Sequence, residues 1–146
     1  MSDNQIIVYG NVGTEVECRS SNGFQWAMFR VASTPRFLDR QRGWQDLETV
    51  WFTVKVTRQL AKNASSSLRV GHPVVVVGRL RTHVWEDEAK QTQQRDVLEA
   101  TAVCHDLGRG TTTFERHEPE PKAEPVSEAA TIREFEQKNQ TSSLTA

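Results

Sequence analysis

Residues 49–56 alternate strictly, with an aliphatic or phenylalanine side chain at every second position, and this pattern restricts the fold more than any other feature of the chain. A period of two is that of a β-strand with one buried and one exposed face, and a helix does not produce it. The segment therefore predicts a strand whose outer face carries Trp51 and Lys55. The opposite face, directed into a core, consists of Val50, Phe52, Val54 and Val56.

Four further segments have the composition of strands, and one has the spacing of a helix. Apolar side chains at positions 60, 61, 64 and 68 share one face of a helix predicted over residues 58–68. Five strands with a single helix between the third and the fourth have the order of an OB-fold barrel. We predict an all-β, five-stranded OB-fold barrel, and a sandwich-like β domain is the alternative from pattern alone. The four further strands are predicted over residues 6–9, 25–33, 74–85 and 95–104.

The composition changes near residue 115. Residues 118–125 are rich in Pro and Glu, and residues 139–146 are small and polar. So few large apolar side chains cannot offset the conformational entropy that is lost when a segment becomes ordered. We therefore predict a folded domain over residues 1–115 and a disordered tail over residues 116–146.

Basic side chains are concentrated in the middle of the chain. The whole sequence has 18 Lys and Arg against 19 Asp and Glu, yet residues 30–81 contain ten basic and three acidic side chains. Such a block within a neutral total suits a polyanionic partner. No apolar run approaches the roughly 20 residues of a membrane span, and the first residues have no signal-peptide pattern. We therefore expect a reducing cytosol and no membrane partner.

Three of the predicted strands carry a tryptophan together with cations on their outer faces. Besides the strand of Trp51, the second strand directs Trp26 and Arg30 outward, and the fourth directs Arg81 and Trp85 outward. Bases of a single nucleic-acid strand stack on such rings while Lys and Arg neutralise its phosphates. An outward tryptophan can equally pack against a neighbouring element or against another copy of the chain. The core-facing side of the fourth strand is predicted to consist of Val74, Val76, Leu80 and Val84.

The sequence has few residues that could form a catalytic or metal centre. None of the four histidines has a metal-ligand partner at suitable spacing, Cys18 has no basic partner, and Cys104 has the core parity of its strand. We expect no enzymatic activity, no catalytic residue, no metal and no cofactor. The alternative among enzymes is a metal-dependent nuclease that would use Asp39, Asp46 and Glu48 in a flexible, basic loop.

Several motifs together resemble the bacterial single-stranded-DNA-binding proteins. The most specific is GHPVVVVGRLRT over residues 71–82, which is similar to the family's pattern Lys-Gly-x-x-Val-x-Val-x-Gly-x-Leu-Arg-Thr. The resemblance covers residues 5 to about 108. The other matching motifs, in the family's order and spacing, are residues 11–13, 29–34, 51–54 and the helix 60–68.

The resemblance implies an OB-fold barrel, commonly assembled as a homotetramer, that binds single strands without strong sequence preference. The family's stacking aromatics correspond to Phe37, Trp51 and Trp85. Thr57 stands where many members have another aromatic, and Trp26 and Trp44 are the candidates to replace it. Taken together, the predicted DNA-binding residues are Trp26, Arg30, Arg36, Phe37, Trp44, Trp51, Lys55, Arg79, Arg81 and Trp85.

The predicted function is to bind and protect single-stranded DNA in the cytoplasm, at the nucleoid, during replication, recombination or repair. The tail typical of the family ends in an acidic tip with Pro-Phe that recruits other proteins, whereas residues 139–146 have no acidic side chain. We therefore expect an accessory paralogue that binds such partners weakly or not at all. An RNA-binding or translation-type OB-fold module is the alternative among binding proteins.

Overall fold

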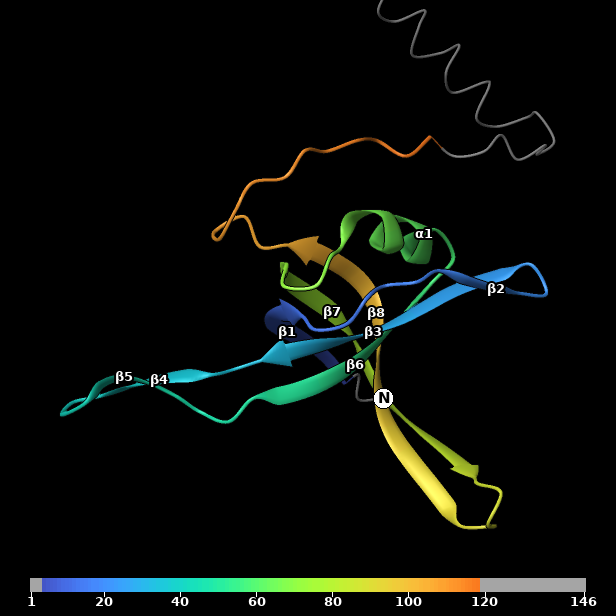
Figure 1. Cartoon of the computed structure of the whole chain (residues 1–146), viewed down its shortest axis with the longest axis horizontal. Helices are drawn as coiled ribbons and strands as arrows, with labels where there is room; N and C mark the ends of the chain where they lie inside the picture. Colours follow the sequence, from blue (N-terminus) through green and yellow to red (C-terminus); the bar gives the residue numbers. More distant parts are fainter. Residues whose placement is uncertain (1–3, 119–146) are drawn as a thin grey trace, which may run out of the picture. The chain divides into compact units, whose positions relative to one another are not determined.

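Eight strands and one helix make up the computed structural model, which describes residues 4–118 (Figure 1). All five predicted strands and the predicted helix are present, together with three short additional strands over residues 19–21, 36–39 and 43–46. The elements are β1 (Gln5–Val12), β2 (Arg19–Ser21), β3 (Phe24–Ser33), β4 (Arg36–Asp39), β5 (Gly43–Asp46), β6 (Val50–Thr57), α1 (Arg58–Ser67), β7 (Pro73–Glu86) and β8 (Thr92–His105).

The long strands close into a barrel. Their sheet has the order β1-β7-β8-β6-β3-β2, and β1 also pairs with β3, where Asn11 lies opposite Ala32 and Val12 lies opposite Val31. The pairing of β6 with β8 is parallel, and the others are antiparallel. Because α1 falls between the third and fourth barrel strands in chain order, the predicted OB-fold barrel is confirmed.

Closure of the barrel depends on a glycine in β1. A Cβ atom on Gly10 would overlap the backbone oxygen of Ala32 and approach a methyl group of Val31. Only a residue without a side chain therefore lets β1 come this close to β3 at the point where the sheet closes.

The core follows the alternation in the sequence. Phe29 and Val31 of β3 and Val54 and Val56 of β6 are buried, while their sequence neighbours point outward. Helix α1 covers the barrel with its predicted apolar face, of which Ala61 is fully buried. The other fully buried or nearly fully buried core side chains include Val8, Val12, Ala64, Leu68, Val74, Val76 and Leu98.

A bulge in β8 overturns the prediction that Cys104 faces the core. Val77 of β7 pairs with Ala102, but the next residue, Gly78, pairs with Ala100, so Thr101 is an extra residue in β8. An extra residue exchanges the inner and outer sides of the strand beyond it. Cys104 is therefore exposed.

Two valines predicted for the core are also exposed, because their strands extend past the barrel. Val84 is 62% exposed on the part of β7 that pairs only with β8, as a free-standing hairpin. Val50 is 48% exposed at the first residue of β6. Alternation shows which side chains lie on the core-facing side of a strand, but it does not show where along the strand the barrel core ends.

Residues 36–46, most of which the sequence predicted as a flexible loop, form the β4–β5 hairpin. A salt bridge joins Arg36 Nε to Asp46 Oδ1 at 2.9 Å, across the two strands. At the turn, Asp39 Oδ1 accepts hydrogen bonds from the backbone N–H groups of Gln41 and Arg42. In Figure 1 this hairpin and the outer part of the β7–β8 hairpin both project from the barrel.

The compact unit that contains the barrel extends to Thr112. The predicted domain boundary at residue 115 stays a prediction, and residues 119–146, which make up most of the predicted tail, lie outside the described residues. Within residues 4–118, no helix has the length and apolar character needed to cross a membrane.

Candidate nucleic-acid interface

Four strands of the barrel present a continuous outer surface, which we call the four-strand face. Its strands lie in the order β3, β6, β8 and β7. One row across it runs from Met28 to Lys55, then to Glu99 and Arg79, since each residue is the pairing partner of the next. The face is defined by the outward side chains of Trp26, Met28, Arg30, Trp51, Lys55, Arg79, Arg81, His83, Trp85, Arg95 and Glu99. Val97 is on the same side of β8 but is buried.

Trp51 is half-exposed, and its ring is held by two neighbours. Its side chain is 48% exposed, and the guanidinium carbon of Arg30 lies 4.7 Å from the ring centroid. Gly13 lies close against the same ring, where a Cβ atom would come within 2.5 Å of it. A cation at this distance is attracted by the electrons of the ring. The contacts with Arg30 and Gly13 therefore fix the orientation of a partly exposed aromatic platform.

Trp85 stands beside a hollow of about 240 Å³ on the same face. The ring is 46% exposed. The hollow is lined by Met28 of β3, Lys55 of β6 and Arg95 of β8, so that a second aromatic platform is surrounded by cations from neighbouring strands.

A second hollow, of about 280 Å³, shares Lys55 with the first. Arg79 and Arg81 of β7 line it together with Thr57. Glu99 also lines it, with one oxygen 3.8 Å from Arg81 Nε and the other 3.6 Å from His83 Nε2. Cations and a hydroxyl group around a small hollow suit an anion such as a phosphate.

Comparison with known proteins identifies the family of the chain. Residues 3–105 match the single-strand binding protein family. The chain belongs to this family. It is 43% identical to single-stranded DNA-binding protein 1 of Streptomyces coelicolor over 117 residues, which cover 80% of this chain and 74% of that protein. It is 40% identical to single-stranded DNA-binding protein 2 of Streptomyces avermitilis over 131 residues, or 89% of this chain and 82% of that one.

Solved structures of the family have the same fold. The small single-stranded DNA-binding protein of Streptomyces coelicolor matches with a TM-score of 0.65 and 43% identity, over 75% of this chain and 100% of that one. The Plasmodium falciparum single-strand binding protein, solved in complex with single-stranded DNA, matches with a TM-score of 0.62 and 26% identity, over 72% of this chain and 96% of that one.

Trp26 lies directly across from Thr57, the position where the family resemblance implies an aromatic residue. Trp26 of β3 is the pairing partner of Thr57 of β6, at one end of the four-strand face. Its ring is half-buried, with the guanidinium carbon of Arg19 at 5.9 Å from the ring centroid. Of the two candidates to replace the missing aromatic, Trp26 is therefore the one on the four-strand face.

The structure does not bring the predicted hairpin residues onto a single surface. Trp44 pairs with Leu38, whereas Phe37 pairs with Gln45, and cross-strand partners share a side of a hairpin. Since Phe37 and Leu38 are adjacent, the rings of Phe37 and Trp44 lie on opposite sides, 43% and 61% exposed. Arg36 is on the side of Trp44, with its guanidinium carbon 5.8 Å from the ring centroid.

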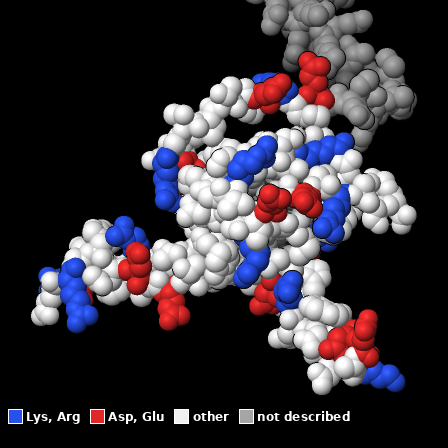
Figure 2. Space-filling view, viewed as in Figure 1, with Lys and Arg blue, Asp and Glu red and all other residues white. Residues whose placement is uncertain are grey.

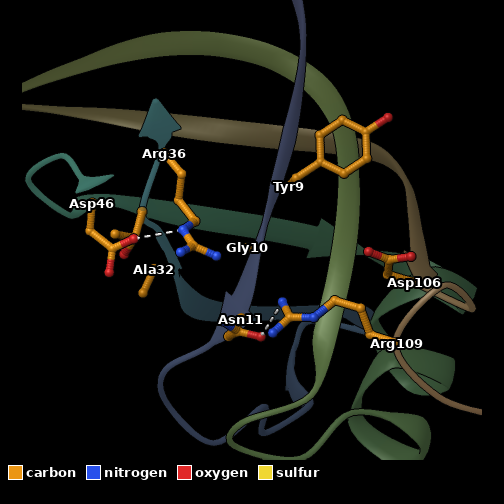
Figure 3. A pocket seen from close by; sticks show the side chains of 9 residues that line it. Tyr9, Gly10, Asn11, Ala32, Arg36, Asp46, Asp106 and Arg109 are labelled. Carbon is orange, nitrogen blue, oxygen red and sulfur yellow. Dashed lines mark hydrogen bonds and ion pairs between the residues drawn. The ribbon is translucent and has the colours of Figure 1, made fainter. Parts of the chain in front are cut away.

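Arg36 also lines a hollow away from the four-strand face. This hollow, of about 650 Å³, lies beside β1 (Figure 3). Arg36 remains paired with Asp46 there, and on the other side of the strand Arg109 donates a hydrogen bond to Asn11 Oδ1 at 3.3 Å. Both guanidinium groups therefore already have partners within the chain.

The sequence-based set omitted two charged residues of the four-strand face, Arg95 and Glu99. Both come from β8, after the basic block, where the balance of charges gave no reason to select them. The alternation of β8 could have shown them, because Arg95, Val97 and Glu99 share one side of the strand. The parallel pairing that sets this side beside Lys55 is a tertiary contact that no local pattern shows.

Proposed function

We propose that this chain binds single-stranded DNA on the four-strand face, without strong sequence preference. The observation that carries the proposal is the gathering of two half-exposed tryptophan rings, Trp51 and Trp85, with Lys55, Arg79 and Arg81 on one continuous surface. Stacking on a ring and neutralisation of a phosphate both act on parts that every nucleotide has, so neither selects a base.

Each residue has a distinct role in this proposal. Trp51, oriented by Arg30, and Trp85 stack bases, and Trp26 adds a platform at the end of the face. Lys55, Arg79 and Arg81 contact phosphates. The hairpin residues extend the contact beyond the barrel. Phe37 contacts the strand that crosses the hairpin on its side, whereas Trp44 and Arg36 are available only to a strand on the opposite side.

The proposed role is to hold and protect exposed strands during replication, recombination or repair, without catalysis. A protein with this ligand acts in the cytoplasm, at the nucleoid, where such strands arise. The nuclease alternative draws little support, because Asp39 caps the hairpin turn and Asp46 is paired with Arg36. Weak binding to partners that require an acidic Pro-Phe tip rests on residues 139–146, which lie outside the described residues, and stays a prediction.

We also propose that the chain assembles with itself, as a homotetramer, through what we call the apolar face. Ile7 and Tyr9 of β1 are 60% and 66% exposed and pair with Val77 and Val75 of β7. Exposed apolar side chains that lie side by side favour contact with another apolar surface. The apolar face consists of Ile7, Tyr9, Val75, Val77, Ala102 and Cys104.

A titration of tryptophan fluorescence with a thymidine oligomer tests the proposed function. We expect quenching, tighter binding of the DNA than of the matching uridine RNA, and a log–log salt dependence with a slope of about −0.7 per phosphate contact. Arg79→Ala and Arg81→Ala should each make the slope shallower, whereas Arg69→Ala, which removes the same charge from the loop after α1, should not. Affinity that does not change with salt would contradict the proposal, and cleavage of labelled strands with magnesium or manganese would support the nuclease instead.

A further inference from the structure

Glu99 places a carboxylate at the centre of the cationic part of the four-strand face. Its pairing partner on β6 is Lys55, and its pairing partner on β7 is Arg79. Its two oxygens lie 3.8 Å from Arg81 Nε and 3.6 Å from His83 Nε2. One acidic side chain is thus surrounded by four basic ones, and no other residue among those that define the face is acidic.

These contacts contribute little to the fold. The distances are long for ion pairs, and the side chains of Glu99, Arg81 and His83 are 44%, 54% and 47% exposed. Exposed ion pairs of this kind stabilise a protein only slightly, because water screens the charges and both side chains lose freedom. The carboxylate can therefore leave its partners without damage to the barrel.

The place that Glu99 occupies is also the place that suits a phosphate. Lys55, Arg79 and Arg81 surround the same hollow of about 280 Å³, and the Glu99 carboxylate lines it. We propose that this carboxylate is an internal competitor for the DNA backbone: it holds Arg81 and His83 in the free protein and is displaced from them by a phosphate when a strand binds.

This exchange rests on the proposed function and lowers the affinity for DNA in a defined way. The displaced carboxylate remains beside the bound strand and attracts a cation, which offsets one of the cations that the DNA releases when it binds. Binding is then weaker and less sensitive to salt than the number of cations on the face implies. The stacking contacts at Trp51 and Trp85 are unaffected, because the ion-pair partners of the Glu99 carboxylate are Arg81 and His83.

The test is Glu99→Gln, which keeps the size of the side chain and removes its charge. At a slope of −0.7 per contact, removing the offset of one cation corresponds to about eightfold tighter binding at about 50 mM salt, with the advantage lost near 1 M. We expect this gain, and a log–log slope steeper by about 0.7, in titrations with a thymidine oligomer.

Asp96→Asn is the matched control. It removes one negative charge from the same strand, but Asp96 lies on the opposite side of β8, where its carboxylate accepts a hydrogen bond from the Thr82 hydroxyl at 2.6 Å. We expect its affinity to stay within about twofold of the parent, since a distant charge acts only through the screened field.

Glu99→Asp is the second variant, which keeps the charge and withdraws it by one methylene group, and it should also bind more tightly than the parent. The proposal is overturned if both Glu99 variants bind no more tightly than the parent at low salt, or if Asp96→Asn gains as much as Glu99→Gln. A parent protein that does not bind the oligomer would instead contradict the proposed function.

Discussion

The two halves of β7 carry unlike outer surfaces. In the first half, Val75 and Val77 lie beside the apolar side chains of β1 on the apolar face. In the second half, Arg79, Arg81 and Trp85 belong to the four-strand face, and the pairing with β1 ends at Arg79, opposite Gln5. All five side chains share one side of the same strand, so the alternation that directs them outward is the same in both halves.

The difference shows that alternation decides which side chains face outward, and that their chemistry decides what can cover them. Water solvates cations well but solvates contiguous apolar side chains poorly. The apolar face is therefore suited to a second apolar surface, whereas the four-strand face is suited to a polyanion with flat rings. If this division is right, a substitution that disrupts the function of one face should leave the function of the other face intact.

The largest effect is expected when a charge is placed on the apolar face. Ile7→Asp should reduce the mass in solution to that of a single chain at about micromolar protein, because burial of an unpaired carboxylate costs several kcal/mol. Light scattering measures the mass. Lys55→Asp is the control, since it places the same charge on the four-strand face and should leave the assembly intact. An Ile7→Asp protein with the parent's mass would show that the apolar face is not the contact.

The reverse test removes the rings from the four-strand face. The double variant Trp51→Ala, Trp85→Ala should lose about 2–6 kcal/mol of binding free energy for a thymidine oligomer, because each lost stack costs about 1–3 kcal/mol. Both rings are about half exposed, so the thermal unfolding midpoint and the mass should change little. The double variant retains only Trp26 and Trp44, so tryptophan quenching is no longer a sufficient measure of DNA binding. The fluorescence anisotropy of a labelled oligomer measures the affinity instead. Parent affinity in the double variant would contradict the proposed role of the face.

A smaller effect is expected on the β4–β5 hairpin. Since Phe37 and Trp44 lie on opposite sides, a strand that crosses the hairpin on one side contacts only one of them. The family resemblance favours Phe37, so Phe37→Ala should lower the affinity by about 1 kcal/mol, at the low end for a stack, and Trp44→Ala should leave it nearly unchanged. Each substitution serves as the control for the other. Equal losses would mean that the strand passes around the hairpin tip.

The sequence predicted the barrel well, because its strands repeat one local rule. Alternation placed Phe29, Val54 and Val56 inside and Trp51 and Lys55 outside, and these are their positions. The rule was wrong where a single residue changed the register, as at Thr101, which turned Cys104 outward. A bulge depends on how two strands match, and this match is not visible in either strand alone.

The candidate site could be predicted in composition more readily than in arrangement. The basic block and the tryptophans indicated the chemistry, but the neighbours of each side chain come from strand pairing. The pairing of Trp26 with Thr57 joins residues 31 positions apart, and the pairing of Lys55 with Glu99 joins residues 44 positions apart. The separation of Phe37 from Trp44 required the register of a hairpin whose residues gave no strand pattern.

The tip of the β7–β8 hairpin marks where the four-strand face ends. The three residues after Trp85 are the acidic Glu86, Asp87 and Glu88. Figure 2 shows red side chains gathered toward the end of this hairpin, whereas the β4–β5 hairpin carries both blue and red ones. At the tip, Asp87 Oδ1 accepts a hydrogen bond from the backbone N–H of Gln91 at 2.9 Å, and Asp87 Oδ2 accepts one from Gln93 Nε2 at 3.0 Å. These bonds favour the charged carboxylate, and they hold the pKa of Asp87 below its ordinary value of 3.8.

The smallest effect is therefore expected from Asp87→Ala, which should loosen the turn and leave both faces unchanged. The amide proton of Gln91 loses its acceptor and should exchange faster with solvent, as measured by NMR, while the DNA affinity and the mass stay those of the parent. The pH dependence has a definite sign. Because the pKa is lowered in the folded protein, the contribution of Asp87 is complete above pH 3.8 and is lost as the pH falls through the lowered pKa. A distinct rise in DNA affinity in Asp87→Ala would mean that the strand reaches the tip, and that the four-strand face extends further along the hairpin than Trp85.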